Sequence, residues 1–189
     1  MTPVAIDWLV LTGGAASRLG HDKASTQVGG RSLREHVHGA IRSVDAAAPI
    51  TDVGPEHQGG PAAAIVAMLP ECTAPIVGVV AVDMPFAESV LGVLVAAASD
   101  AAPDIDAWVP RDGRGKDQRL CALYRRSALV EHADTADWHG RRFGDLLTDM
   151  NINRVPVDEG TSLIDIDTPE DLQRAIAIAV GDQEEQRDG

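Results

Sequence analysis

The sequence predicts an α/β fold with three layers: a Rossmann-like, mostly parallel sheet flanked by helices on both faces. Two observations favour this fold. Apolar segments of strand length alternate along the chain with segments in which apolar residues recur at helical spacing. Two of the strand-like segments, residues 6–12 and 76–82, are mostly apolar, as expected of strands that are buried on both faces.

The chain of 189 residues is expected to form one domain, because domains commonly span about 100–200 residues. We place this domain at residues 1–181 and expect the acidic tail at 182–189 to be disordered. A hydrophobic share of 44% is ample for a core, but aromatic residues make up only 3% of the chain, so aliphatic side chains must fill that core.

The formal net charge of −13 argues against non-specific binding to nucleic acids and against docking on an anionic membrane. The longest apolar run, residues 76–82, is far shorter than the ~20 residues that a membrane-spanning helix needs. The N-terminus shows no basic leader, and Cys72 and Cys121 lack the spacing of a metal site, so both are expected to be buried thiols. These features predict a cytoplasmic protein.

The first strand, expected at residues 6–12, leads into the loop LTGGAASRLGHDK at residues 11–23. Two adjacent glycines, Gly13 and Gly14, let the backbone turn sharply and bring its amide groups close to a bound anion. The loop is therefore a candidate anion-binding site at the end of a buried strand.

Two positive charges, Arg18 and Lys23, lie in the same loop and favour a polyphosphate as the anion. The glycine spacing excludes the dinucleotide-binding fingerprint, because that motif has one other residue between its first two glycines, whereas Gly13 and Gly14 are adjacent. It also excludes the P-loop, because His21 follows Gly20 where that motif requires lysine. The loop therefore belongs to another kind of phosphate-binding site.

A helix is expected at residues 32–44, with Ser32 as its N-cap. No clear strand follows Asp45, although a parallel α/β unit should supply one there. Loss of a sheet strand would cost more than a domain with ~5–15 kcal/mol of stability could bear. We therefore expect that a stretch between Asp45 and Pro49 is missing from the sequence.

The buried strand at 76–82 ends at Asp83, and Pro85 fixes the turn after it. Ligands of open α/β sheets bind at the carboxyl ends of the strands, so Asp83 is a candidate metal ligand. The alternative is that Asp83 caps the helix that begins near Ala87.

The remaining elements continue the alternation of helices and strands. A strong helix start is expected at Thr168, whose hydroxyl can cap the helix, with Pro169 in the first turn. Helices are expected at residues 61–69, 89–98, 125–132, 141–147 and 168–180, and strands at 105–109, 120–124, 153–157 and 163–166.

Three motifs, in order along the chain, resemble those of molybdenum cofactor guanylyltransferases, in the MobA-like nucleotidyltransferase family. They are the loop at residues 11–23, VDMPF at 82–86 and DIDTPEDL at 165–172. The segments GGPAAA at 59–64 and LCALY at 120–124 are also similar. The matches span nearly the whole chain, and they imply the nucleotidyltransferase fold, which is related to that of the glycosyltransferase-A enzymes.

The resemblance implies transfer of GMP from GTP to the terminal phosphate of molybdopterin, with Mg²⁺ as cofactor and release of pyrophosphate. It also implies transient contacts with other molybdenum cofactor proteins. The implied nucleotide-binding residues are Leu11, Thr12, Gly13, Gly14, Lys23, Asp52 and Asp83, of which Asp83 would also bind Mg²⁺.

Arg18 and Lys23 are the catalytic residues that the resemblance and the charge pattern favour. Attack by one phosphate on another is mainly a problem of charge and positioning, so fixed cations can carry most of the catalysis. Arg18 can hold the triphosphate through two parallel donors, and Lys23 supplies a compact positive charge.

Two positions depart from the family motif, because Asp165 and Asp167 replace the asparagines of its N-I-N segment. They could be hydrogen-bond acceptors, further carboxylates near the metal, or turn residues. The basic loop at residues 111–119 either clamps the phosphate or the pterin of the acceptor, or is simply solvated.

Other functions of the same fold stay open at this stage. One is cytidylyl transfer, or nucleotidyl transfer to another small acceptor. Another is a catalytically silent nucleotide-binding protein, which the apparently missing strand favours and which the intact Arg18, Lys23 and Asp83 oppose.

Overall fold

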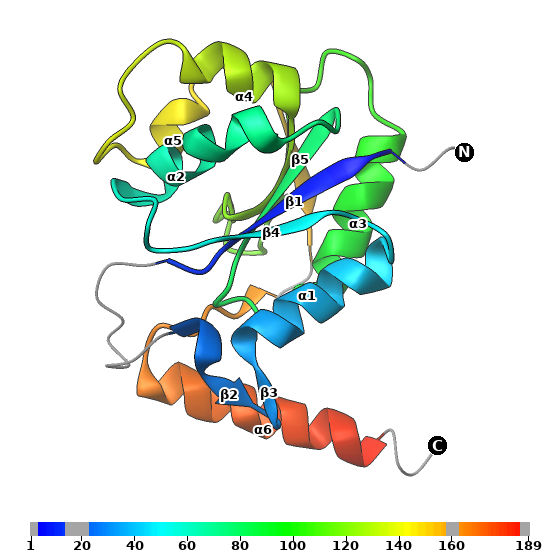
Figure 1. Ribbon diagram of the computed structural model, residues 1–189. Helices are drawn as coiled ribbons and strands as arrows, with labels where there is room; N and C mark the ends of the chain where they lie inside the picture. Colours follow the sequence, from blue (N-terminus) through cyan, green and yellow to red (C-terminus); the bar gives the residue numbers. More distant parts are fainter. Residues whose placement is uncertain (1–3, 14–22, 158–162, 186–189) are drawn as a thin grey trace.

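A computed structural model describes residues 4–13, 23–157 and 163–185 of the chain (Figure 1). These residues form a six-stranded sheet in the order β4-β1-β5-β7-β6-β8. Strands β4, β1 and β5 are parallel to one another, β6 and β8 are also parallel, and β7 runs antiparallel to both of its neighbours. The strands are β1 (Ile6–Leu11), β4 (Ile50–Val53), β5 (Ile76–Ala81), β6 (Ala107–Arg111), β7 (Cys121–Arg125) and β8 (Ile152–Pro156).

Helices cover both faces of the sheet and give the three predicted layers (Figure 1). One face carries α1 (Leu33–Val44) and α3 (Glu88–Ser99), which pack against each other. The other carries α2 (Gly60–Met68), α4 (Arg126–Ala133) and α5 (Phe143–Leu146). The predicted α/β fold with a mostly parallel sheet is therefore confirmed.

The C-terminal helix α6 (Pro169–Glu185) lies below the sheet in Figure 1, against a small hairpin of β2 (Gln27–Val28) and β3 (Arg31–Ser32). Short 3₁₀ turns, η1 (Lys23–Ser25) and η2 (Leu69–Glu71), precede that hairpin and follow α2. None of the described helices is both long and apolar enough to span a bilayer.

Helix α1 begins as the sequence predicts, with Ser32 as its N-cap. The Ser32 hydroxyl accepts a hydrogen bond from the backbone N–H of Glu35 at 3.2 Å, and the Glu35 carboxylate accepts one from the backbone N–H of Ser32 at 2.7 Å. This reciprocal capping box satisfies backbone donors that a helix start otherwise leaves unpaired.

The strand that the sequence seemed to lack is present, so the prediction of a missing stretch between Asp45 and Pro49 is wrong. Residues Ile50–Val53 form β4, which pairs in parallel with β1 along its whole length. The backbone N–H of Trp8 donates to the carbonyl of Pro49 at 2.9 Å and extends this pairing. As the edge strand of the sheet, β4 buries only Val53 fully, and for this reason its sequence lacks a long apolar run.

Two other predictions differ from the structure. Residues 163–166 were expected to be a strand, but none of them lies in a strand, and residues 164–166 are irregular backbone that leads to α6. Helix α6 continues to Glu185 rather than ending near residue 180, so the first residues of the expected tail are helical. Residues 186–189 lie outside the described part of the chain.

The centre of the sheet depends on a glycine that lies opposite an aromatic ring. Gly78 on β5 pairs with Trp8 on β1, and both lie in buried strands. A Cβ atom at position 78 would overlap the six-membered ring of Trp8. The indole therefore fills the space that a side chain on β5 would otherwise take.

We predict that Gly78→Ala lowers the free energy of unfolding by about 1–3 kcal/mol, because it overpacks the centre of the sheet. Urea titration followed by circular dichroism measures this. Gly181→Ala in α6 is the matched control, since its added Cβ meets no atom within 4 Å, and its stability should stay equal or rise slightly. A Gly78→Ala protein as stable as the parent would show that the Trp8 contact does not constrain the sheet.

Candidate functional site

The carboxyl ends of β4, β1 and β5 meet at one edge of the sheet, because these strands are parallel. The backbone N–H groups of Thr12 and Gly13 both donate to the carbonyl of Val53, at 3.0 and 3.2 Å. A Cβ atom on Gly13 would lie 2.8 Å from the carbonyl carbon of Gly54. Only glycine therefore lets the start of the loop pass this close to the neighbouring backbone.

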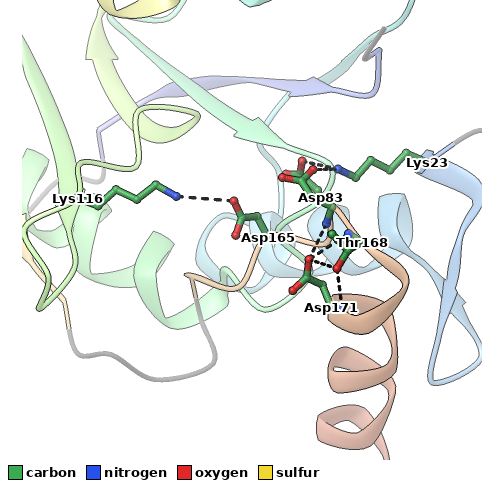
Figure 2. A network of polar contacts seen from close by, with 7 residues as sticks. Lys23, Asp83, Lys116, Asp165, Thr168 and Asp171 are labelled. Atoms are coloured by element: carbon green, nitrogen blue, oxygen red, sulfur yellow. Dashed lines mark hydrogen bonds and ion pairs between the residues drawn. The ribbon is translucent and has the colours of Figure 1, made fainter. Parts of the chain in front are cut away.

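Lys23, at the other end of that loop, reaches the same sheet edge from η1. Its Nζ atom donates to Oδ2 of Asp83 at 2.9 Å and to Oδ1 of Asp167 at 2.7 Å (Figure 2). The Lys23 side chain is 18% exposed and that of Asp83 is 23% exposed. One ammonium group thus joins three segments that are far apart in sequence.

Asp83 is placed by the backbone around it. Its neighbour Val82 donates a hydrogen bond to the carbonyl of Leu11 at 3.1 Å, and its own carbonyl accepts one from Ile166 at 3.0 Å. The first bond ties it to β1 and the second to the segment before α6. Helix α3 has Ala87 as its N-cap, with no side-chain cap, so the alternative role of Asp83 as a helix cap is wrong.

Burial and the neighbouring charges both shift the pKa of Asp83. Burial raises the pKa of Asp83, and the carboxylates of Asp167 and Asp165 add to that rise, while the Lys23 ammonium opposes it. Burial alone would lower the pKa of Lys23, but the hydrogen bond to Asp167 and the attraction of Asp83 outweigh burial, and the pKa is raised. The ammonium therefore stays charged among acids whose negative charges exceed its own.

Oxygen ligands of this kind suit Mg²⁺, which usually takes one or two carboxylates and completes its shell with water and phosphate oxygens. Within the described residues, no group of three or more His, Cys, Asp or Glu side chains is arranged to hold a metal ion. Asp83 and its neighbour Asp167 thus fit a metal that brings most of its ligands with the substrate, and they do not form a closed metal cage.

The start of α6 has a second capping arrangement. The Asp171 carboxylate accepts hydrogen bonds from the backbone N–H of Thr168 at 3.0 Å and from its hydroxyl at 2.7 Å. The Thr168 hydroxyl accepts in turn from the backbone N–H of Asp171 at 3.2 Å. The predicted helix start at Thr168 is confirmed, and it fixes the backbone on which Asp165 and Asp167 lie.

A pocket of about 290 Å³ opens between this segment and the loop that joins β6 to β7. Lys116 from that loop approaches Asp165 across the pocket, with 3.8 Å between its Nζ atom and Oδ2 (Figure 2). Figure 2 shows Asp165 between Lys116 and Asp83. The pocket is therefore adjacent to the carboxylates that Lys23 joins.

Asp52, which the family motif suggests as a nucleotide contact, points toward α1. Its carboxylate receives a hydrogen bond from Nε2 of His38 at 2.8 Å and lies 3.4 Å from the Arg34 guanidinium. The structure does not bring it to Lys23 or Asp83. The expected nucleotide-binding Gly14 and the expected catalytic Arg18 lie outside the described residues.

Sequence reasoning missed the contact between Lys23 and Asp167, and it missed His38 as the partner of Asp52. A signal for Asp167 was present, since it occupies the second asparagine position of the family's N-I-N segment. No sequence signal links His38 to Asp52, because that contact depends on how α1 packs beside the edge strand.

Comparisons with known proteins agree with this geometry. The molybdopterin-guanine dinucleotide biosynthesis protein A of Archaeoglobus fulgidus is 25% identical, with a TM-score of 0.68 over 93% of this chain and 99% of that one. The 2-C-methyl-D-erythritol 4-phosphate cytidylyltransferase of Thermus thermophilus is 22% identical, with a TM-score of 0.64 over 90% and 97%. A manganese complex of a Mycobacterium tuberculosis protein is 15% identical, with a TM-score of 0.67 over 92% and 99%.

Two further comparisons concern the sequence itself. A search of curated proteins finds no match. The family model of the MobA-like NTP transferase domain matches residues 8–149, which include the glycine loop, β4 and Asp83. The chain therefore belongs to the MobA-like NTP transferase domain family, as its sequence motifs predict.

Proposed function

We propose that this protein transfers GMP from GTP to the terminal phosphate of molybdopterin, with Mg²⁺ as cofactor and release of pyrophosphate. The observation that carries the proposal is the position of Lys23, whose ammonium lies between Asp83 and Asp167 at the end of the glycine loop. Family membership and the likeness to the Archaeoglobus fulgidus protein support the reaction class.

The nucleotide would bind along the start of the loop, through the backbone at Leu11, Thr12, Gly13 and Gly14. The close approach of Gly13 to Gly54 supports this assignment, because it leaves the loop without side-chain bulk beside the edge strand. Asp52 stays a predicted nucleotide contact, and it would have to exchange its hydrogen bond with His38 for one to the nucleotide.

The metal would be held by Asp83, with Asp167 next to it. When bound, Mg²⁺ supplies positive charge that neutralises the triphosphate and the departing pyrophosphate. A structural neighbour from Mycobacterium tuberculosis was solved as a manganese complex, which supports a divalent ion in this fold.

Positioning and charge are what this chain contributes to the reaction. An oxygen of the acceptor phosphate forms a bond to the α-phosphorus of GTP, and the bond from that phosphorus to the pyrophosphate oxygen breaks. Lys23, with Arg18 as its predicted partner, would stabilise the charge that develops on the phosphates. Because the attacking phosphate is already an anion, no side chain has to remove a proton.

Cytidylyl transfer is the second candidate, and the 22% identical Thermus thermophilus cytidylyltransferase motivates it. The catalytically silent alternative has lost its main argument, because β4 is present next to β1. Transient contacts with other molybdenum cofactor proteins and a cytoplasmic location are part of the same proposal.

Nucleotide preference can be tested by the thermal stability of the protein. We expect 1 mM GTP with Mg²⁺ to raise the melting temperature more than CTP or ATP does. A ligand that binds only the folded state stabilises it by RT ln(1 + [L]/Kd), which is about 2.7 kcal/mol when the ligand is at roughly 100 times its Kd. The nucleotide that binds most tightly should therefore give the largest shift. Differential scanning fluorimetry measures the shifts, with each nucleotide in EDTA as the control. A larger shift with CTP would favour the cytidylyltransferase, and equal shifts would reject the GTP preference.

Replacing Lys23 by alanine should lower kcat/KM for GMP transfer by about 100- to 1,000-fold, because a charge that stabilises the phosphates is lost. Pyrophosphate release in the presence of molybdopterin is the readout. Arg141→Ala is the control, because it removes a cation that stacks on Trp138, on the face of the sheet that carries α2, α4 and α5. It should leave the rate unchanged. Near-normal pyrophosphate release by Lys23→Ala would exclude the assigned role of Lys23.

Asp83→Asn should raise the Mg²⁺ concentration needed for half-maximal activity by about tenfold or more, because an amide is a weaker ligand for this hard cation than a carboxylate. The assay is pyrophosphate release as a function of Mg²⁺. Asp100→Asn, at the exposed end of α3, serves as the control. An unchanged Mg²⁺ dependence in Asp83→Asn would mean that the metal binds elsewhere.

A further inference from the structure

The pocket beside Asp83 is the feature that the proposed function leaves without a ligand. Its volume of about 290 Å³ is at the small end of the ~300–1,000 Å³ of ligand pockets, so it can take one compact group. Its walls come from the loop between β6 and β7, from the segment that leads into α6 and from the first turns of α6. The backbone N–H of Ile166 donates to the carbonyl of Asp83, so the pocket has a fixed position relative to the site of transfer.

Two of the acids in this pocket are already engaged. The Asp112 carboxylate accepts hydrogen bonds from the backbone N–H groups of Arg114 and Lys116, at 3.0 and 2.8 Å, and so shapes the loop. The Asp171 carboxylate caps α6 through Thr168. These bonds use one oxygen of each carboxylate and give both residues a structural role in the walls.

Lys116 and Asp165 face each other without a short hydrogen bond between them. Their charged atoms are 3.8 Å apart, which exceeds the ~2.7–2.9 Å of a charge-assisted hydrogen bond. Their side chains are 59% and 48% exposed, and both line the pocket. The pocket thus presents two acceptor oxygens from Asp165 next to a donor from Lys116.

We propose that this pocket binds the pterin ring of the acceptor through its 2-amino-4-oxopyrimidine edge. Along that edge the 2-amino group and N3–H are donors, and the 4-oxo group beside them is an acceptor. The two donors pair with the Asp165 carboxylate and the 4-oxo oxygen accepts from Lys116. This inference rests on the proposed function, and it adds the residues that select the acceptor.

In this arrangement, the replacement of the motif's first asparagine by Asp165 has a chemical consequence. The motif has asparagine where this chain has Asp165. An amide offers one acceptor and one donor, whereas a carboxylate offers acceptors only. Asp165 therefore matches a ligand edge with two adjacent donors, and it disfavours a ligand that presents an acceptor at the same place.

The position of the pocket explains why the edge belongs to the acceptor and not to guanine, which carries the same chemistry. Lys116 and Asp165 lie on one side of Asp83, and Lys23 approaches Asp83 from the other side (Figure 2). Lys23 is the last residue of the glycine loop that is assigned to the nucleotide. A pterin in the pocket would have its phosphate-bearing end free to reach Asp83.

Binding of 6-hydroxymethylpterin to the full-length protein, followed by the fluorescence of the pterin, tests this inference without any catalytic turnover. Asp165→Asn and Lys116→Gln should each weaken binding by about tenfold, because each removes a charge-assisted hydrogen bond. Asp104→Asn is the matched control and should bind like the parent, because Asp104 precedes β6 and so lies at the opposite end of that strand from the Lys116 loop. Circular dichroism checks that each variant is folded.

Three outcomes would overturn the assignment. They are no binding of 6-hydroxymethylpterin by the parent protein at millimolar concentration, unchanged binding in both variants, or equally strong binding of erythritol 4-phosphate, which lacks the edge. Loss of GTP binding in Asp165→Asn with intact pterin binding would assign the pocket to guanine instead. A parent protein that binds the pterin but shows no thermal shift with GTP would reject the proposed donor and leave the pocket assignment standing.

Discussion

The contact of one ammonium group with two carboxylates holds the candidate site together. Lys23 is 60 residues away from Asp83 and 144 away from Asp167 in sequence, and its Nζ atom bonds to both. These bonds join the end of the glycine loop, the end of the central strand β5 and the start of α6. Burial disfavours an unpaired carboxylate, and for this reason it raises the pKa of Asp83. A positive partner offsets this cost. A cationic lysine and a divalent metal ion are both suited to such a place.

Much of the fold could be predicted from the sequence, because short segments of the chain carry the signals for individual strands and helices. Strands β1 and β5 are buried on both faces, so the short apolar runs around Trp8 and Gly78 mark them clearly. Helix α1 was predictable from Ser32, whose capping role depends only on Glu35 three residues later. Strand β4 escaped prediction because it lies at the sheet edge, where Thr51 and Asp52 face partly solvated surroundings and need no apolar side chains.

The site was predictable in part. Family motifs pointed to Lys23 and Asp83 as site residues, and the structure brings these two side chains into contact. The partners that complete the arrangement come from distant segments, and no local pattern encodes them. Asp167 meets Lys23 because the segment before α6 is bonded to the end of β5 through Ile166 and Asp83, and Lys116 meets Asp165 because the loop after β6 and that segment line the same pocket. The orientation of Asp52 toward His38 likewise follows from the packing of α1.

The reversal of one strand has a consequence for how such a protein could diversify. Because β7 runs antiparallel to β5 and β6, the chain leaves β6 at the edge of the candidate site and returns at once into the sheet. The segment with Lys116 is thus a short loop that is anchored at both ends by core strands. Its sequence can change while the glycine loop and Asp83 keep their places. Under the proposed function, the part of acceptor recognition that this loop would provide could therefore change without rebuilding the segments that would bind the triphosphate.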